Sequence, residues 1–185
     1  MHTLNDGISL RVLEKKDLEW ARLLHNEPST LCMLTNNEPV SQVQQHMWFK
    51  KLCISPTSSR WVITCKAPAG DVPVGVVRID NKDYKNSSVQ IGLDIASAHR
   101  RQGIATKVYK YLLTFFFDKL EMNRISLKVL ETNLGAKRIY EKLGFIQEGI
   151  ERQAIYRDGK FIDYILMSVL RDEYEKNRNR YSTIA

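Results

Sequence analysis

Two arginines and a glycine form the stretch of the sequence whose residue types best suit chemistry. Arg100 and Arg101 are followed by Gly103 and Ala105, and an apolar periodic segment begins at Ile104. A helix start carries backbone N–H groups without intrahelical partners and a partial positive charge, so it binds anions well. Glycine lets an anion approach the backbone, and the guanidinium groups add charge. The stretch therefore predicts a pyrophosphate cradle, and an ordinary solvated basic loop is the alternative that this motif alone leaves open.

The elements on either side of this turn are a strand and a helix. Residues 89–95 alternate in the way that a half-buried strand does. Between residues 104 and 120, apolar side chains recur every three or four positions, which predicts a helix with one buried face. A second strand over residues 125–130 follows. The order strand, helix, strand implies a parallel pair joined by a right-handed crossover.

Further strands and turns extend this core. We expect strands at residues 8–13, 61–65, 74–79, 145–146 and 164–170. Turn-forming residues lie at 67–71 and at 157–160, and each turn predicts a hairpin. The strands at 61–65, 74–79 and 89–95 then form an antiparallel meander, so the whole sheet is mixed.

Polar residues at helix starts predict three further helices. Asp17 is expected to cap a helix that ends near Asn26, and Ser41 a second one. Asn133 is expected to cap a third, with Gly144 at its C-terminal end. We expect the apolar side of the second helix to carry three residues, which are Val43, Met47 and Leu52. The first two helices would form a lid or wall.

Length and composition bound the class of protein. A chain of 185 residues is long enough for one domain with a buried core, which we assign to residues 1–172, with a charged tail that frays over residues 173–185. The three cysteines and four histidines lack metal-ligand spacing, so no metal site is expected. Neither a signal pattern nor a membrane-spanning apolar run is found, which favours a soluble, cytoplasmic protein without a membrane partner.

The chain carries a formal net charge of +7 and has a pI near 9.3. Such a charge implies attraction to polyanions. The basic residues are nevertheless spread along the chain, and no nucleic-acid-binding motif is present, so nucleic acid is not the expected partner. A phosphorylated cofactor explains part of the excess charge.

Two separated motifs together resemble the GNAT superfamily of acyl-CoA-dependent N-acetyltransferases. Residues 91–105 are similar to its R/Q-x-x-G-x-G/A motif, and residues 133–145 to its N-x-x-A-x-x-x-Y-x-x-x-G-F helix. The resemblance implies an α/β (α+β) fold with a mixed, mostly antiparallel sheet of six to seven strands, a parallel central pair and about four flanking helices. Residues 148–167 resemble the branch of ribosomal-protein N-terminal, spermidine and nucleotide-sugar N-acetyltransferases, and the helix at 41–52 most resembles the amino-sugar members.

The resemblance implies acetyl-CoA as co-substrate and assigns roles to particular positions. The residues that would hold its pyrophosphate are Arg100, Arg101, Gln102, Gly103, Ile104 and Ala105. The strand backbone at Leu93, Asp94 and Ile95 would pair with the pantetheine arm, where two parallel strands splay apart, and would offer an N–H to the thioester oxygen. Asn133 would contact the same arm, and Tyr140 would protonate the departing sulfur.

Each side-chain assignment has a structural alternative. Asn133 is explained equally by helix capping, and Tyr140 lies on an apolar stripe where a core tyrosine would also fit. His46 is the candidate general base, with a structural histidine as the alternative. Several polyamine-acetylating relatives carry a glutamate where this chain has Gln90, so no base is carried over. A water chain, or an amine whose pKa falls on desolvation, would serve instead.

The expected function is transfer of acetyl from acetyl-CoA to a primary amine by direct attack in a ternary complex. The acceptor stays open between an amino sugar on a nucleotide carrier, a protein N-terminus and a polyamine, and the net charge of +7 disfavours a polycation. The alternative is a non-catalytic module on the same fold that binds CoA or nucleic acid. A homodimer is the oligomer that we consider.

Overall fold

The computed structural model describes residues 2–4 and 7–181. Its strands form one mixed sheet in the order β1-β2-β3-β4-β5-β6-β8-β7. The chain divides into two compact units, residues 1–82 with 92–107, and residues 83–91 with 108–185. Strand β5 (Ser88–Ile95) and helix α4 (Ile104–Thr114) each contribute residues to both units. The expected mixed α/β fold with a parallel pair is confirmed, but the described residues form eight strands and six α-helices, where six to seven strands and about four helices were expected.

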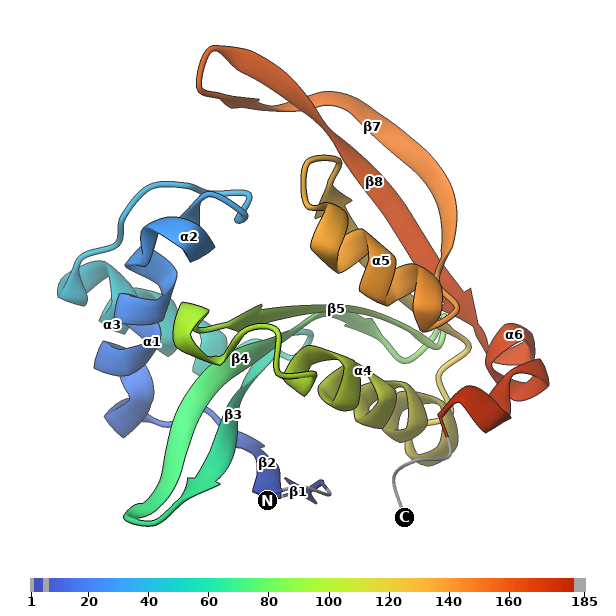
Figure 1. Ribbon diagram of the computed structural model, residues 1–185, viewed down its shortest axis with the longest axis horizontal. Helices are drawn as coiled ribbons and strands as arrows, with labels where there is room; N and C mark the ends of the chain where they lie inside the picture. The colour runs from blue at the N-terminus through green and yellow to red at the C-terminus, as the bar shows by residue number, and fades with distance from the viewer. Residues whose placement is uncertain (1, 5–6, 182–185) are drawn as a thin grey trace. The chain divides into compact units, whose positions relative to one another are not determined.

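The first unit contains an antiparallel set of strands (Figure 1). These are β1 (His2–Thr3), β2 (Ile8–Val12), β3 (Ser59–Ala67) and β4 (Gly70–Asp83), of which the last residue belongs to the second unit. β2 pairs with β1 and β3, and β3 with β4, which confirms the hairpin at residues 67–71. β1 was not predicted, because a strand of two residues is too short to show an alternation of apolar and polar positions.

Three α-helices of the first unit follow β2 in the chain: α1 (Leu18–Asn26), α2 (Pro28–Leu31) and α3 (Gln42–Cys53). The cap on α3 is confirmed, because Ser41 Oγ accepts a hydrogen bond of 3.2 Å from Gln44 N. The cap expected from Asp17 on α1 is wrong. Its carboxylate instead accepts hydrogen bonds of 2.6 and 2.7 Å from Arg11 and of 2.9 Å from Glu14 N in the preceding 3₁₀ turn.

The apolar side expected for α3 is also wrong. Val43 is 69% and Met47 56% exposed. Trp48 and Phe49 pack instead on the core formed by Leu13, Leu18, Ala21 and Val62. Gln45 is buried on the same stripe of the helix. Because this inward-facing residue is polar, the pattern of apolar residues predicted the wrong inner face.

The second unit holds the parallel pair. β5 pairs with β6 (Arg124–Leu130) from Ser88↔Arg124 to Gln90↔Ser126, which confirms the expected crossover. β6 then pairs with β8 (Lys160–Leu170), and β8 forms a long hairpin with β7 (Ile146–Arg157), so the final strands are longer than expected (Figure 1). Helix α5 (Leu134–Lys142) connects β6 to this hairpin, and Gly144 follows it with a φ of +84°, as expected.

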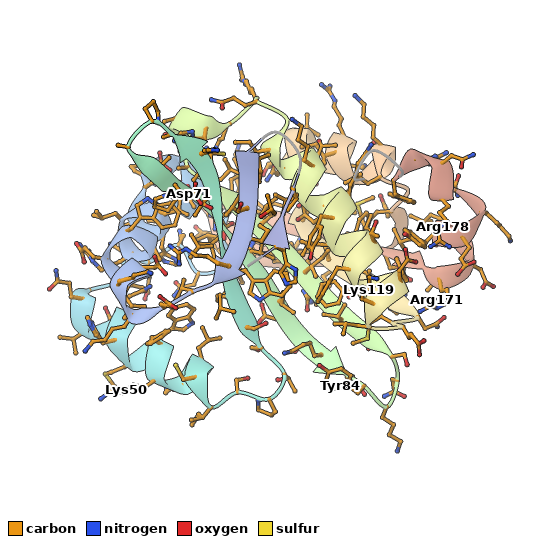
Figure 2. All side chains as sticks on the ribbon, turned by 90° about the horizontal axis from the view of Figure 1, so that it is seen from below. Lys50, Asp71, Tyr84, Lys119, Arg171 and Arg178 are labelled. Carbon is orange, nitrogen blue, oxygen red and sulfur yellow. The ribbon has the colours of Figure 1, made fainter. Side chains whose placement is uncertain are left out.

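The helix expected over residues 104–120 is α4 followed by a π-helical turn, Phe115–Lys119. The chain ends in α6 (Arg171–Lys176) and a 3₁₀ turn, Arg178–Arg180. Figure 2 shows Arg171 and Arg178 on this C-terminal segment.

The expectation that the C-terminal tail frays is wrong through Tyr181. Tyr174 and Tyr181 are buried, Tyr181 Oη donates to Leu143 O at 2.7 Å, and Arg178 pairs with Asp118 at 2.9 Å. Two aromatic anchors hold a segment that its charged composition alone predicts to be loose. Residues 182–185 of that tail lie outside the described residues. In the described part of the chain, every helix is too short or too polar to cross a bilayer.

Candidate active site

The turn between β5 and α4 has the backbone shape that an anion site needs. Arg101 has a φ of +60° and Gly103 a φ of +77°, so the chain bends sharply before the helix begins. The first helical hydrogen bond is that of Lys107 N to Gly103 O, at 3.1 Å. A Cβ atom built on Gly103 would have no other atom within 4 Å, so this side of the turn is open.

Helix α4 presents its positive end to that open side. The N–H groups of Ile104, Ala105 and Thr106 lie in the first turn, where an α-helix supplies no intrahelical partner. The first turn has no acidic side chain, and its cap, Gly103, has no side chain at all. The helix runs for 11 residues, long enough for a substantial dipole. These features fit the diphosphate of a coenzyme.

Arg100 is engaged with the protein itself. Its Nε donates to Ile95 O at 2.8 Å, Nη1 to Ser29 Oγ at 3.0 Å, and Nη2 to Thr30 Oγ1 at 2.7 Å. All of these partners belong to the first unit. The guanidinium therefore ties α2 to the end of β5, and this geometry supports a role in positioning the turn.

Glu27 completes this connection. Its carboxylate accepts hydrogen bonds from Thr30 Oγ1 at 3.0 Å and from Ser97 N at 3.3 Å, and lies 3.7 Å from Arg100 Nη2. Burial alone would raise the pKa of Glu27, but the hydrogen bonds from Ser97 and Thr30 and the charge of Arg100 hold it below its usual value. The Glu27 carboxylate is therefore ionised at neutral pH and keeps its ion pair with Arg100.

Arg101 and Gln102 lie on the exposed part of the turn. Gln102 Nε2 donates to Ala98 O at 3.2 Å, which fixes the turn locally. Because Arg101 is exposed beside Gly103, its charge is available to a ligand at the start of α4.

Replacing each arginine by methionine should separate the two roles. Arg100→Met removes charge-assisted hydrogen bonds and should destabilise the protein by about 2 kcal/mol, which lowers the Tm by about 4–8 °C. Arg101→Met should leave the Tm unchanged and weaken acetyl-CoA binding by about fivefold, or about 1 kcal/mol. Thermal melting and titration calorimetry measure both effects. Weaker binding in Arg100→Met with an unchanged Tm would contradict the division.

The strand segment proposed to pair with the pantetheine arm lies at the end of β5. Leu93, Asp94 and Ile95 are half-buried. Asp94 Oδ2 lies 3.1 Å from Arg78 Nε, and Ile95 O is the acceptor that holds Arg100. Asp94 and Ile95 are thus fixed by contacts with arginine side chains.

A cavity of about 410 Å³ lies in the same unit. Its walls come from α1, the α2–α3 segment, α3 and the strands β3 to β5, so the early helices do form a wall. Among the described residues, α3 contributes Gln44, Gln45 and Trp48 to the lining, and not His46. The His46 side chain is exposed, with Nδ1 2.8 Å from Gln42 O.

His46→Gln is therefore expected to change turnover by less than about twofold, because the imidazole lies on the outer face of α3. Steady-state acetyl transfer measured across pH 6–9 tests this expectation. Loss of a limb of the pH profile in the variant would instead identify His46 as the base.

The second unit holds the other two predicted side chains. Asn133 Oδ1 accepts a hydrogen bond from Ala136 N at 3.2 Å, so the residue does cap α5. Tyr140, on α5, is 8% exposed, and its hydroxyl lies 3.1 Å from the hydroxyl of Tyr109.

Tyr109 is the residue that sequence reasoning missed. It lies on α4, and its ring meets those of Tyr140 and Phe145 edge-on, with centroids 5.2 and 6.3 Å apart. The available signal was a polar hydroxyl in the apolar stripe of α4, beside Val108 and Leu112. A hydroxyl buried there needs a partner. The contact with Tyr109 orients the Tyr140 hydroxyl, and an isolated tyrosine in an apolar core would lack such a contact.

The fold and the turn before α4 define a class of acyltransferase. Residues 8–146 match the model of the acetyltransferase (GNAT) domain. The chain belongs to this family. It is an acetyl-CoA-dependent N-acetyltransferase, and acetyl-CoA is the co-substrate whose diphosphate suits the start of α4.

Three relatives illustrate the range of the family. The chain is 28% identical over 163 residues to the L-amino acid N-acetyltransferase AaaT of Escherichia coli, covering 87% of this chain and 96% of the relative. It is 25% identical over 171 residues to the spermidine N(1)-acetyltransferase of Vibrio cholerae, covering 92% and 97%. A putative ribosomal N-acetyltransferase, YdaF of Bacillus subtilis, is 32% identical over 101 residues, but the match covers only 55% of either chain.

A solved structure supports the same assignment. The spermidine N-acetyltransferase of Vibrio cholerae, in complex with CoA and spermine, superposes with a TM-score of 0.84 at 25% identity, covering 92% of this chain and 99% of that one. In the described part of this chain, no cluster of three or more His, Cys, Asp or Glu side chains could hold a metal ion.

Proposed function

We propose that the protein transfers the acetyl group of acetyl-CoA to a primary amine by direct attack of the amine in a ternary complex. The observation that carries this proposal is the open, positively charged start of α4 behind the left-handed turn at Arg101 and Gly103. The N–H groups of Gly103, Ile104 and Ala105 bind the diphosphate. Arg101 adds charge, Gln102 shapes the turn and Arg100 positions it.

The remaining roles follow from what acyl transfer requires. The backbone at Leu93 to Ile95 pairs with the pantetheine arm and offers an N–H to the thioester oxygen as negative charge develops there. Asn133 contacts the arm in addition to capping α5. Tyr140 donates its hydroxyl proton to the sulfur as negative charge develops there, and it takes a proton back from water afterwards. The acceptor amine loses its proton to water, so a dedicated base is not required.

The acceptor belongs to one of three classes: an amino sugar on a nucleotide carrier, a protein N-terminus or a polyamine. The spermidine N(1)-acetyltransferase of Vibrio cholerae supports a polyamine, and YdaF, as a putative ribosomal N-acetyltransferase, supports an acceptor on the ribosome. AaaT adds free amino acids to the classes that an experiment must include.

Three further proposals concern the whole protein. We assign the chain to one acetyltransferase domain, because β5 and α4 each contribute to both compact units, and the buried Tyr174 and Tyr181 extend it beyond the expected end at residue 172. A dodecameric form of the Vibrio cholerae enzyme supports self-association, for which a homodimer is the smallest form. No disulfide joins Cys32, Cys53 or Cys65 in the described part of the chain, which suits the reducing cytoplasm.

Release of free CoA thiol tests the proposed function. The protein is incubated with acetyl-CoA and a panel of amines, and thiol is measured against controls without amine or without protein. Amine-dependent thiol release is the expected result. Stabilisation by acetyl-CoA without turnover on any amine would indicate a non-catalytic binding module, and salt-sensitive retention on DNA without such stabilisation would indicate a nucleic-acid-binding one.

A further inference from the structure

The cavity of the first unit is lined by charged side chains of both signs. Among the described residues that line it are two guanidinium groups, Arg60 and Arg78, and a single carboxylate, Asp94. The other polar side chains of the lining include His25, Thr35, Gln44 and Gln45. The lining therefore holds one more guanidinium group than carboxylate, and Arg60 also pairs with Asp80, which does not line the cavity.

Arg60 is held rigidly by one of its nitrogens. Nη1 donates to Ser59 O at 2.9 Å, to Ile79 O at 3.1 Å and to Asp80 Oδ1 at 2.9 Å. The guanidinium carbon also lies 5.9 Å from the ring centroid of Trp48. Within the described residues, these contacts of Arg60 are made by Nη1 or by the planar face of the guanidinium group. Nε and Nη2 are the donors that remain for a ligand, on a side chain that is only 13% exposed.

Arg78 is placed by a glycine in the neighbouring strand. Its Nε lies 3.1 Å from Asp94 Oδ2, and its Nη2 lies 3.3 Å from Oδ1. A Cβ atom on Gly92 would come within 2.9 Å of Nη2, so only glycine lets the guanidinium lie in this place. Because Asp94 is shared with Arg78, its charge is already largely compensated.

We propose that this cavity binds the acceptor, and that the acceptor is an amine that also carries an anionic group, a carboxylate or a phosphate. This inference rests on the proposed function. The anionic group pairs with Arg60 and Arg78, and the amine faces Asp94 on β5. Asp94 lies between Leu93 and Ile95, the backbone that we propose to hold the reactive end of acetyl-CoA.

A polyamine does not match these walls. Each of its ammonium groups requires a carboxylate or several carbonyl oxygens when it leaves water. The cavity offers one carboxylate, which Arg78 already pairs. An acceptor with one amine and at least one negative charge is instead complementary to two guanidinium groups and one carboxylate.

Matched acceptor pairs test the proposal on the unmodified protein. One pair is glucosamine 6-phosphate and glucosamine, which differ by a phosphate. The other compares L-leucine with its amide, which lacks the carboxylate. The amine of the amide is less basic than that of leucine, so more of it is in the neutral, reactive form. This difference favours the amide and therefore works against the expected result. We expect kcat/KM to favour the anionic member of at least one pair by about tenfold or more, and the responding pair identifies phosphate or carboxylate as the group.

Two variants then connect the preference to the cavity. Arg60→Met and Arg78→Met should each reduce the ratio of kcat/KM for the anionic member to kcat/KM for the neutral member by about tenfold, which is about 1.4 kcal/mol. The ratio is the readout because a loss of activity that both members share cancels in it. Lys50→Met is the matched control. This lysine lies on the wall helix α3 but is exposed and points away from the molecule (Figure 2), so its loss should leave the preference intact.

The outcomes separate this inference from the proposed function. Acetyl transfer to neutral amines or to spermidine with kcat/KM equal to that of the anionic acceptors would overturn the inference and keep the proposed function. A preference that survives in both arginine variants would place the anion site elsewhere. Failure of every amine in the panel, with acetyl-CoA bound, would overturn both.

Discussion

Tyr140→Phe is expected to lower turnover by about 10²-fold or more while leaving the affinity for acetyl-CoA unchanged. The reason is that the substitution keeps the ring, its burial and its edge contact with Tyr109, and removes only the proton proposed to reach the departing sulfur. Single-turnover acetyl transfer with a saturating acceptor measures the chemical step, and titration calorimetry with acetyl-CoA measures binding.

Tyr109→Phe is the matched control for that substitution. Both variants delete one hydroxyl of the same 3.1 Å contact, so both should lose about 1 kcal/mol of stability. Tyr109→Phe leaves the Tyr140 hydroxyl in place, and its turnover should fall by less than about tenfold. Equal losses of turnover in the two variants would show that Tyr140 acts only through packing.

Gly103→Glu is expected to abolish the stabilisation that acetyl-CoA gives to the protein. The added carboxylate lies at the positive end of α4, where it occupies the open side of the turn and repels a diphosphate. Thermal melting with and without saturating acetyl-CoA measures the effect. Wild-type protein should gain a stability of RT ln(1 + [acetyl-CoA]/Kd), and the variant should gain none.

Gly103→Ala separates the blocked site from backbone strain. Both substitutions place a Cβ atom at a φ of +77°, which costs about 1–2 kcal/mol in either variant. Alanine adds no charge, and its Cβ meets no atom within 4 Å. The alanine variant should therefore melt at a lower temperature and still respond to acetyl-CoA. An unchanged response in Gly103→Glu would remove the cradle from this turn.

Local chemistry explains which helix starts could be predicted. Ser41 and Asn133 cap their helices as the sequence indicates, because each side chain reaches an N–H three residues along the chain. Asp17 has the same chemistry, but Arg11 on β2 lies close enough to take its carboxylate. That competition depends on how strand and helix pack, which the residues near Asp17 do not reveal.

The inner face of α3 could not be predicted for a related reason. Val43 and Met47 look like core residues by type, yet they are exposed, whereas Gln45 is buried and lines the cavity. A binding site requires polar side chains where a core would use apolar ones, so hydrophobic periodicity fails there.

The sequence motif pointed to the turn that we propose for the coenzyme, but it could not assign different roles to the two arginines of that turn. Arg100 and Arg101 are adjacent and identical in type. Only the position of α2 shows that Arg100 is committed to Ser29 and Thr30, while Arg101 stays exposed. In the same way, the contact of Tyr109 with Tyr140 joins residues 31 positions apart.

The most direct measurement of the central claim is a crystal structure of the protein with CoA. We predict that the diphosphate oxygens accept hydrogen bonds of about 3 Å from the backbone N–H groups of Gly103, Ile104 and Ala105, with the Arg101 guanidinium beside them. A diphosphate bound anywhere else on the protein would contradict the proposed site, and with it the roles assigned to the residues around it.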